Sequence, residues 1–167
     1  MSKINVFDFY YGAVLSILFS RHINPALVEC TLDRQIYDIT TNRTNIRRMI
    51  KARTDKMPTK SPGYTSWSFS LTQADIQDMT TYLREGYNLV LVLILADKNL
   101  GDSELALIDC EQVQRLLELG KKSICISKAK HEHSYKIAVH HSRMSGIRIP
   151  TNRFDELFKK RTAMTIG

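Results

Sequence analysis

The longest uninterrupted apolar run lies near the middle of the chain, at residues 89–96. None of its alternate positions is polar, so a strand here would carry apolar side chains on both faces. Eight residues rich in branched side chains favour a strand over a helix. Turn-forming residues flank the run, with Asn88 before it and the segment 97–102 after it. The pattern predicts a strand in the middle of a sheet, with helices packed over it.

Short alternating segments separated by turn residues complete the pattern. In chain order they predict a helix at 5–20, strands at 27–32, 35–40 and 46–53, a basic loop at 54–66, a strand at 67–71, a helix at 72–85, the central strand, a strand at 104–109, a helix at 109–119, strands at 123–128 and 135–140, an extended stretch at 146–150 and a last short helix. Asn5, Thr72 and Asp109 are suited to cap the three longer helices, and Gly86 and Gly120 to end the second and third.

These elements predict a single α/β domain over residues 1–167, built on a mixed central β-sheet flanked by helices. Its core would span about residues 5–128, and a basic C-terminal extension would follow at about residues 141–167. A chain of 167 residues with 43% hydrophobic content suits one domain with a sizeable core. No run approaches the ~18 apolar residues of a membrane-spanning helix, so no membrane partner is predicted.

The first residues and the cysteines bear on the cellular compartment. Lys3 and Asp8 do not form a charged leader followed by an unbroken apolar segment, which argues against a secretory signal. Cys30, Cys110 and Cys125 are widely spaced and odd in number. This usage favours reduced, mostly buried thiols and a cytoplasmic location.

The net charge of +7 is unevenly distributed. Residues 43–60 hold seven basic side chains and one acidic, and residues 121–167 hold eleven basic and three acidic. Between them, residues 61–120 hold three basic and nine acidic side chains. Two basic segments separated by an acidic one indicate a positive surface built from distant parts of the chain, as in proteins that bind phosphate groups. The alternative is a solvated surface without a partner.

The first basic segment begins on the third predicted strand and continues into the loop. Alternation places Arg47, Lys51 and Arg53 on one face of that strand. The residues expected to contact phosphates are Arg43, Arg47, Arg48, Arg53, Lys56 and Lys60. Trp67 would offer a stacking surface to an unpaired base. The competing interpretation puts Trp67 in the core, which is the commoner place for a lone Trp beside an apolar strand.

The order helix, three strands, helix, buried strand resembles the αβββαβ core of the PD-(D/E)XK nuclease-like superfamily over about residues 5–96. In that superfamily an acidic residue on the second strand and a (D/E)-x-K triplet on the third bind a divalent metal and activate water. The resemblance places Asp38 at the first acidic position and Lys51 at the lysine. Met49 stands where the second acid is expected, and a thioether cannot replace a carboxylate as a ligand of magnesium.

The resemblance therefore implies one of two outcomes. Either Glu29 on the neighbouring strand supplies the second carboxylate, or the site no longer cuts nucleic acid. A simpler interpretation makes Asp38 a surface or turn-pairing carboxylate and Lys51 one member of a basic strand face. The histidine groups 131–133 and 140–141 match no zinc-binding spacing, and the first falls in a predicted turn, so exposed turn histidines are expected there.

Two functions follow from the sequence. The first is a nucleic-acid-binding protein of nuclease-like fold with a degenerate or relocated phosphodiesterase site, in which Asp38 and Glu29 would bind Mg²⁺ or Mn²⁺ and Lys51 would assist. Whether the protein is a metal-dependent endonuclease stays open on these grounds. The alternative is a non-catalytic protein–protein interaction module, such as a small phage or mobile-element regulator or inhibitor. Its partner would be an acidic protein or, as a homodimer, a second copy of the chain.

Overall fold

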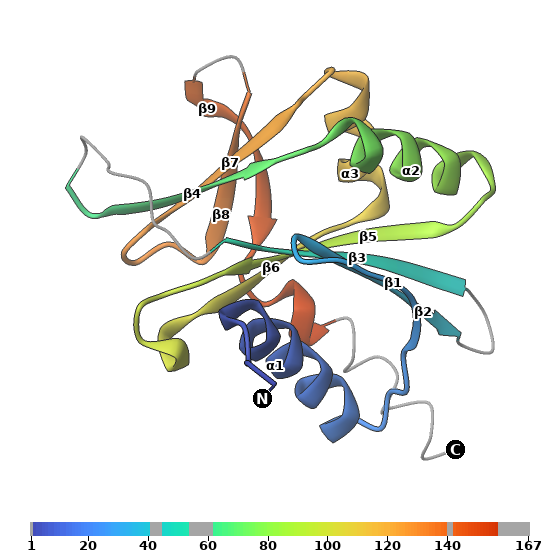
Figure 1. Ribbon diagram of the computed structural model, residues 1–167. Helices are drawn as coiled ribbons and strands as arrows, with labels where there is room; N and C mark the ends of the chain where they lie inside the picture. The colour runs from blue at the N-terminus through green and yellow to red at the C-terminus, as the bar shows by residue number, and fades with distance from the viewer. Residues whose placement is uncertain (1, 41–44, 54–61, 140–141, 157–167) are drawn as a thin grey trace, which may run out of the picture.

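The computed structural model describes residues 2–40, 45–53, 62–139 and 142–156, and Figure 1 shows two β-sheets with helices packed around them. The helices are α1 (Val6–Ser20), α2 (Gln73–Arg84) and α3 (Cys110–Glu118), with a short 3-10 turn η1 (Leu100–Asp102). The strands are β1 (Ala26–Cys30), β2 (Arg34–Thr40), β3 (Asn45–Arg53), β4 (Tyr64–Ser70), β5 (Asn88–Leu95), β6 (Glu104–Ile108), β7 (Ser123–Ala129), β8 (Ser134–Val139) and β9 (Ser142–Pro150).

The larger sheet is mixed and has the strand order β1-β2-β3-β5-β6. The first three strands form an antiparallel meander, β5 runs parallel to β3, and β6 is antiparallel to β5. Helix α1 lies on one face of this sheet, while α2, α3 and the second sheet lie on the other (Figure 1). The predicted fold class, an α/β domain with a mixed sheet flanked by helices, is confirmed.

Strand β5 is the predicted central strand, and both of its faces are buried. Leu89, Leu91, Leu93 and Leu95 point into the core shared with α2, α3 and the second sheet. The intervening Val90, Val92 and Ile94 pack in the core beneath α1. Burial on both faces explains why this strand shows no alternation of polar and apolar residues.

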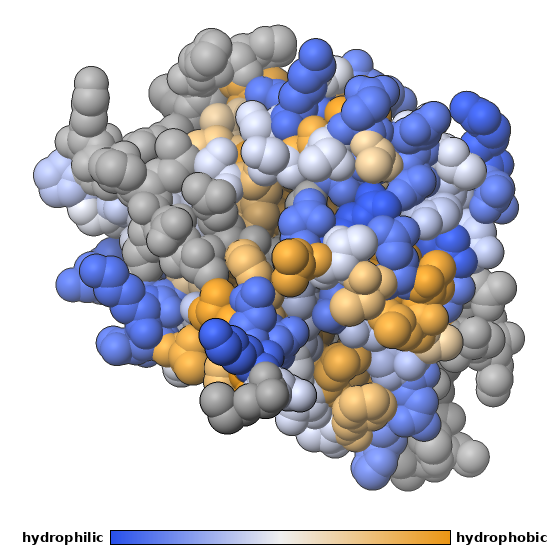
Figure 2. Space-filling model, in the orientation of Figure 1, coloured by the Kyte–Doolittle hydropathy of each residue, from blue (hydrophilic) through white to orange (hydrophobic). Residues whose placement is uncertain are grey.

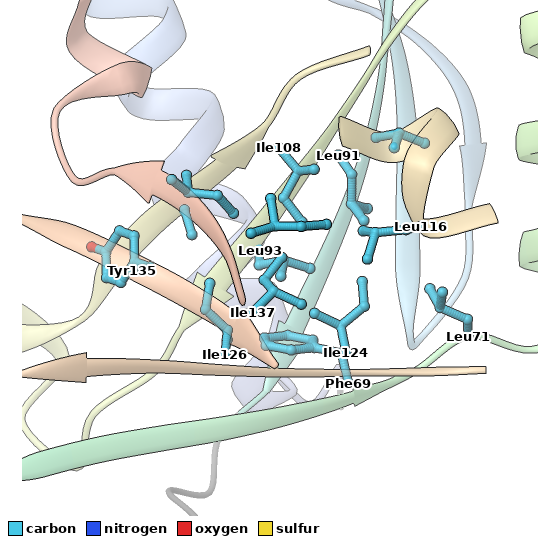
Figure 3. Close-up of a cluster of buried hydrophobic side chains, with 14 of the residues drawn as sticks. Phe69, Leu71, Leu91, Leu93, Ile108, Leu116, Ile124, Ile126, Tyr135 and Ile137 are labelled. Atoms are coloured by element: carbon cyan, nitrogen blue, oxygen red, sulfur yellow. The ribbon is translucent and has the colours of Figure 1, made fainter. Parts of the chain in front are cut away.

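The second sheet is antiparallel and has the strand order β4-β7-β8-β9. Its inward side chains pack directly on the larger sheet: Figure 3 shows Leu91 and Leu93 of β5 facing Ile124, Ile126 and Ile137 of the second sheet. The sequence pattern predicts these strands but not their separation from the central sheet. Alternation identifies the buried face of a strand and does not identify its neighbours.

The predicted helix boundaries agree with the structure to within two residues. Asn5 caps α1 and forms a reciprocal capping box with Asp8, and Thr72 does the same with Asp75 at the start of α2. The Asp109 carboxylate caps α3 by accepting a hydrogen bond from the backbone of Gln112. Gly86 follows α2 with a φ of 84°, a left-handed conformation that favours glycine. No helix within the described residues is both long and apolar enough to span a membrane.

Two expectations about local structure need correction. Strand β4 begins at Tyr64, inside the predicted loop, because it pairs residue by residue with β7 from Tyr64 opposite Ala129 onward. The thiols are not mostly buried: Cys30 is exposed, while Cys110 and Cys125 are half-buried, and all three are free. Cys30 lies on the edge strand β1, and Cys125 lies on the opposite face of β7 from the core residues Ile124 and Ile126.

Candidate functional site

A polar cluster lies between α2 and the face of β1, β2 and β3 that α2 covers. The strand register places Asp38 opposite Arg47 and Glu29 opposite Ile36, and residues directly opposite one another share a face. From α2, Asp75, Asp78 and Tyr82 follow at spacings of three and four and so point to one side of the helix. We call this set the two-arginine cluster; its members are Glu29, Arg34, Asp38, Arg47, Asp75, Asp78, Tyr82 and Tyr87.

Arg34 is the buried centre of the cluster, with its side chain only 8% exposed. Its Nε and Nη2 donate to Glu29 Oε1 at 3.0 and 2.9 Å. Its Nη1 donates to Asp75 Oδ1 at 2.8 Å, and its Nη2 also donates to Asp78 Oδ2 at 2.5 Å. One guanidinium therefore joins the edge strand β1 to the first turns of α2 through three carboxylates.

The charge on Arg34 is fixed by these contacts. Burial lowers the pKa of the Arg34 guanidinium, but its hydrogen bonds to the three carboxylates outweigh burial, and the pKa lies above its ordinary value. Asp75 is itself 1% exposed and also accepts a hydrogen bond from the backbone of Thr72 at 2.9 Å. A buried carboxylate of this kind requires an opposite charge, which Arg34 supplies.

Arg47 holds Asp38 in a bidentate pair. Its Nε donates to Asp38 Oδ1 at 2.7 Å and its Nη2 to Asp38 Oδ2 at 2.8 Å. The guanidinium carbon also lies 4.4 Å from the ring centroid of Tyr82 and 4.1 Å from that of Tyr87, which are cation–π distances. The hydrogen bonds to Asp38 raise the pKa of Arg47 above its ordinary value, against the opposing effect of burial.

These contacts decide what the carboxylates can do chemically. A hard divalent cation needs several free carboxylate or carbonyl oxygens. Both oxygens of Asp38 accept hydrogen bonds from Arg47, and Glu29 accepts two from Arg34. A guanidinium does not lose its proton in a protein, so it cannot yield these oxygens by deprotonation. The donor set does not fit a magnesium or manganese site, and among the described residues no group of three or more His, Cys, Asp or Glu side chains could hold a metal ion.

The three residues expected to act together, Asp38, Lys51 and Glu29, come from three adjacent strands of the larger sheet. Asp38, however, is opposite Arg47, and Lys51 is opposite Arg34, four residues further along β3. At ~3.3 Å per residue, the backbone positions of Asp38 and Lys51 are about 13 Å apart along the strands. The partner of Asp38 is therefore Arg47, a residue expected to contact phosphate.

The expected phosphate-binding residues fall into three groups. Arg43, Lys56 and Lys60 lie outside the described residues, and only the backbone of Arg48 and Arg53 is described, as part of β3. Arg47 is described fully and is bound to Asp38 and two tyrosines. Its half-buried guanidinium is therefore engaged by partners within the protein rather than displayed on a phosphate-binding surface.

Trp67 belongs to the core. It is 3% exposed, and its Nε1 donates to the carbonyl oxygen of Ala96 at 3.1 Å. A base could not stack on a ring buried in this way, so the stacking role assigned to Trp67 is wrong and the core interpretation is correct. The exposed His131 and His133 lie at the turn between β7 and β8, as expected; His140 and His141 are outside the described residues.

At one end of the second sheet, a residue of the second basic segment contacts the part of the chain that follows the first. The backbone N–H of Lys130 donates to the carbonyl of Gly63 at 2.9 Å, just after the first basic segment ends at residue 60. Lys130 is exposed, whereas Lys128 is paired with Glu104 at 2.5 Å and Lys136 with Glu132 at 3.1 Å. Lys130 is thus an exposed cation of the second segment, in contact with Gly63, which lies three residues after the first segment ends.

No protein-family model, curated protein or solved structure shows significant similarity to this chain.

Sequence reasoning missed the centre of the site. In the sequence, Arg34 falls between two predicted strands and Asp75 in the first turn of a predicted helix, and neither position indicates a buried ion pair. The available signal was the placement of Asp75, Asp78 and Tyr82 on one side of α2. A helix side this polar can face a sheet only where the sheet supplies cations. The pattern does not reveal which cations those are, because that depends on the strand register.

Proposed function

We propose that this protein binds nucleic acid on a nuclease-like scaffold in which two arginines stand where a nuclease would hold its metal. It would then be a binding protein that does not hydrolyse phosphodiesters at this site. Of the two outcomes implied by the family resemblance, this is the one in which the site no longer cuts.

The arrangement of the elements supports the nuclease-like scaffold. Helix α1 is followed by the meander β1-β2-β3, then by α2 and by β5, which joins β3 in parallel. The additional strand β4 leaves for the second sheet and does not interrupt the larger one. This is the αβββαβ order to which the sequence points, with Asp38 on the second strand of the meander.

The pairing of both candidate metal ligands with arginine supports the proposed loss of catalysis. Asp38 is held by Arg47 and Glu29 by Arg34, each through two hydrogen bonds. Each carboxylate thereby has an opposite charge without any metal. Charge-assisted and bidentate pairs of this kind are among the stronger hydrogen-bonded contacts in proteins.

The charge distribution supports nucleic acid as the partner. The segments 43–60 and 121–167 are strongly basic, and Lys130 of the second segment hydrogen-bonds to Gly63, three residues after the first segment ends. Lysines and arginines brought together from distant segments neutralise phosphates and release counterions on binding. The interface would therefore lie at the end of the second sheet formed by the start of β4 and the β7–β8 turn.

Salt dependence and one charge reversal test this interface. We expect the affinity for a random-sequence DNA duplex to fall about 100-fold between ~50 and ~200 mM salt, the change for about four phosphate contacts. Lys130→Glu should weaken binding about tenfold at low salt and reduce the salt slope by about one. Fluorescence anisotropy with labelled DNA would measure both effects.

Lys122→Glu is the matched control. Lys122 is also exposed but precedes β7, at the opposite end of the strand from Lys130. Its reversal should change the affinity by no more than about twofold, because it lies roughly 25 Å away at ~3.3 Å per strand residue. An affinity independent of salt would remove nucleic acid as the partner, and equal losses in the two variants would reject the proposed location.

A protein–protein interaction module is the second candidate, and a different surface favours it. Among the described residues, nine large apolar side chains are exposed, and seven of these lie between residues 4 and 32. A concentration of apolar side chains on the surface is typical of protein contacts. This surface is distinct from the basic end of the second sheet, so a protein contact and nucleic-acid binding are compatible.

A further inference from the structure

The solvent-facing side of α1 is apolar. Asp8 is the single charged residue in the helix. Val6, Phe9 and Phe19 are 46%, 53% and 54% exposed, and small residues occupy the exposed positions between the two phenylalanines. A surface helix ordinarily carries polar side chains on its outer side. Figure 2 shows apolar side chains gathered over α1 and the edge strand β1.

We propose that this side of α1 packs against α1 of a second copy of the chain, antiparallel, about a two-fold axis near residue 14. The exposed residues are arranged symmetrically before and after that position. Phe9 is five positions before it and Phe19 five after, while Gly12 is two before and Ser16 two after. An antiparallel pair thus sets each Phe9 beside Phe19 of the second copy and each Gly12 beside Ser16, as an isologous interface requires.

The small residues at the centre allow the two helices to approach closely. A Cβ built on Gly12 would meet nothing within 4 Å in its own chain, so packing within the protein does not require glycine there. Ala13 and Ser16 are also exposed. Small side chains at a crossing permit interaxial distances near ~8 Å, with the phenylalanines packing on either side.

Charge at the two ends of the helix favours a second copy in the antiparallel orientation. Asp8 lies at the N-terminal end of α1, and Arg21 directly follows its C-terminal end. Antiparallel packing sets the positive N-terminal end of each helix dipole beside the negative C-terminal end of the other, whereas parallel packing would bring like ends and the two Asp8 carboxylates together. A lipid surface is a poorer occupant, because α1 has none of the Lys and Arg residues that membrane-surface helices carry.

The exposed area predicts a modest affinity. A phenylalanine side chain buries ~200 Å² when fully covered, so Phe9 and Phe19 each offer about 100 Å². With Ile4 and Val6, at 72% and 46% exposed, they supply roughly half of the ~800 Å² per partner of a standard interface. An interface of this size is typical of a weak, transient dimer.

Sedimentation equilibrium over a range of concentrations tests the dimer. The wild-type protein should shift from the 19.2 kDa monomer toward twice that mass as concentration rises. Ala13→Glu places a charge at the centre of the interface and should leave a folded monomer. The matched control is Ala74→Glu, an exposed alanine on α2, which should dimerise as the wild type does. A wild type that stays monomeric, or an Ala13→Glu variant that still dimerises, would overturn the proposal.

Cross-linking tests the orientation. Under mild oxidation Ala13→Cys should form a disulfide-linked dimer, because the two Ala13 positions are offset by about 3 Å along an antiparallel pair. Phe9→Cys should not link to itself, because its two copies are about 15 Å apart along the axis. The wild type, which has the exposed Cys30, sets the background. Equal linking by both variants would indicate a parallel pair, and co-sedimentation of a monomer with lipid vesicles would assign the face to lipid; either result contradicts the proposal.

Discussion

Arg34→Ala is expected to lower the free energy of unfolding by about 3–5 kcal/mol, as loss of one partner from a buried ion pair does. The variant loses four hydrogen bonds and leaves the carboxylate of Asp75, 1% exposed, without its opposite charge. Lowering the pH should recover part of the lost free energy of unfolding, because protonation of Asp75 in the variant removes the uncompensated buried charge. Urea unfolding at neutral and mildly acidic pH would measure both effects.

Arg84→Ala is the control for this experiment. Arg84 ends α2 and is exposed, and substitutions at such positions ordinarily change stability by less than about 0.5 kcal/mol. A loss for Arg34→Ala no larger than that of Arg84→Ala would show that the three carboxylates do not need the guanidinium. The description of the two-arginine cluster as a buried, charge-compensated unit would then be wrong.

Trp67→Ala is expected to be similarly destabilising, by about 3–5 kcal/mol, the usual cost of truncating a buried aromatic side chain. The ring packs in the core between the two sheets, and its N–H satisfies the carbonyl of Ala96. Trp67 is the single tryptophan of the chain, so Trp67→Ala unfolding should be followed by circular dichroism rather than by tryptophan fluorescence.

Trp67→Leu separates the core role from a binding role. This variant keeps an apolar side chain in the core while removing the aromatic face, so it should be less stable than wild type but bind DNA with unchanged affinity where folded. Base stacking is worth about 1–3 kcal/mol per base, so a tryptophan that stacked on nucleic acid would lose about 5- to 150-fold in affinity on this change. A loss of that size in the folded variant would contradict the core assignment.

The sequence predicts the elements of this fold well because their signals are local. The apolar run of β5, the capping residues Asn5 and Thr72, and the stop at Gly86 each depend on a few neighbouring residues. The partners of the charged residues depend instead on register and on which elements pack together. The resemblance to a nuclease site matches Asp38 with Lys51, but the β2–β3 register places Asp38 opposite Arg47.

The same limit explains why the second sheet and the role of Arg34 were not foreseen. Arg34 lies near a turn in the sequence, where a charged residue is ordinarily exposed, yet α2 returns forty residues later to bury it. Long-range contacts of this kind leave no periodic trace in the chain. They can be inferred in part from an unusual feature, such as the acidic inner side of α2.

Titration of the protein with Mn²⁺, by calorimetry and in parallel with a DNA cleavage assay, tests the central claim most directly. Because Arg47 binds both oxygens of Asp38 and Arg34 binds Oε1 of Glu29, we expect no saturable Mn²⁺ binding and no cleavage. The wild type should behave as Asp38→Asn does in both assays. Saturable binding or metal-dependent cleavage that disappears in Asp38→Asn, but persists when the exposed Asp102 is changed to Asn, would contradict this account.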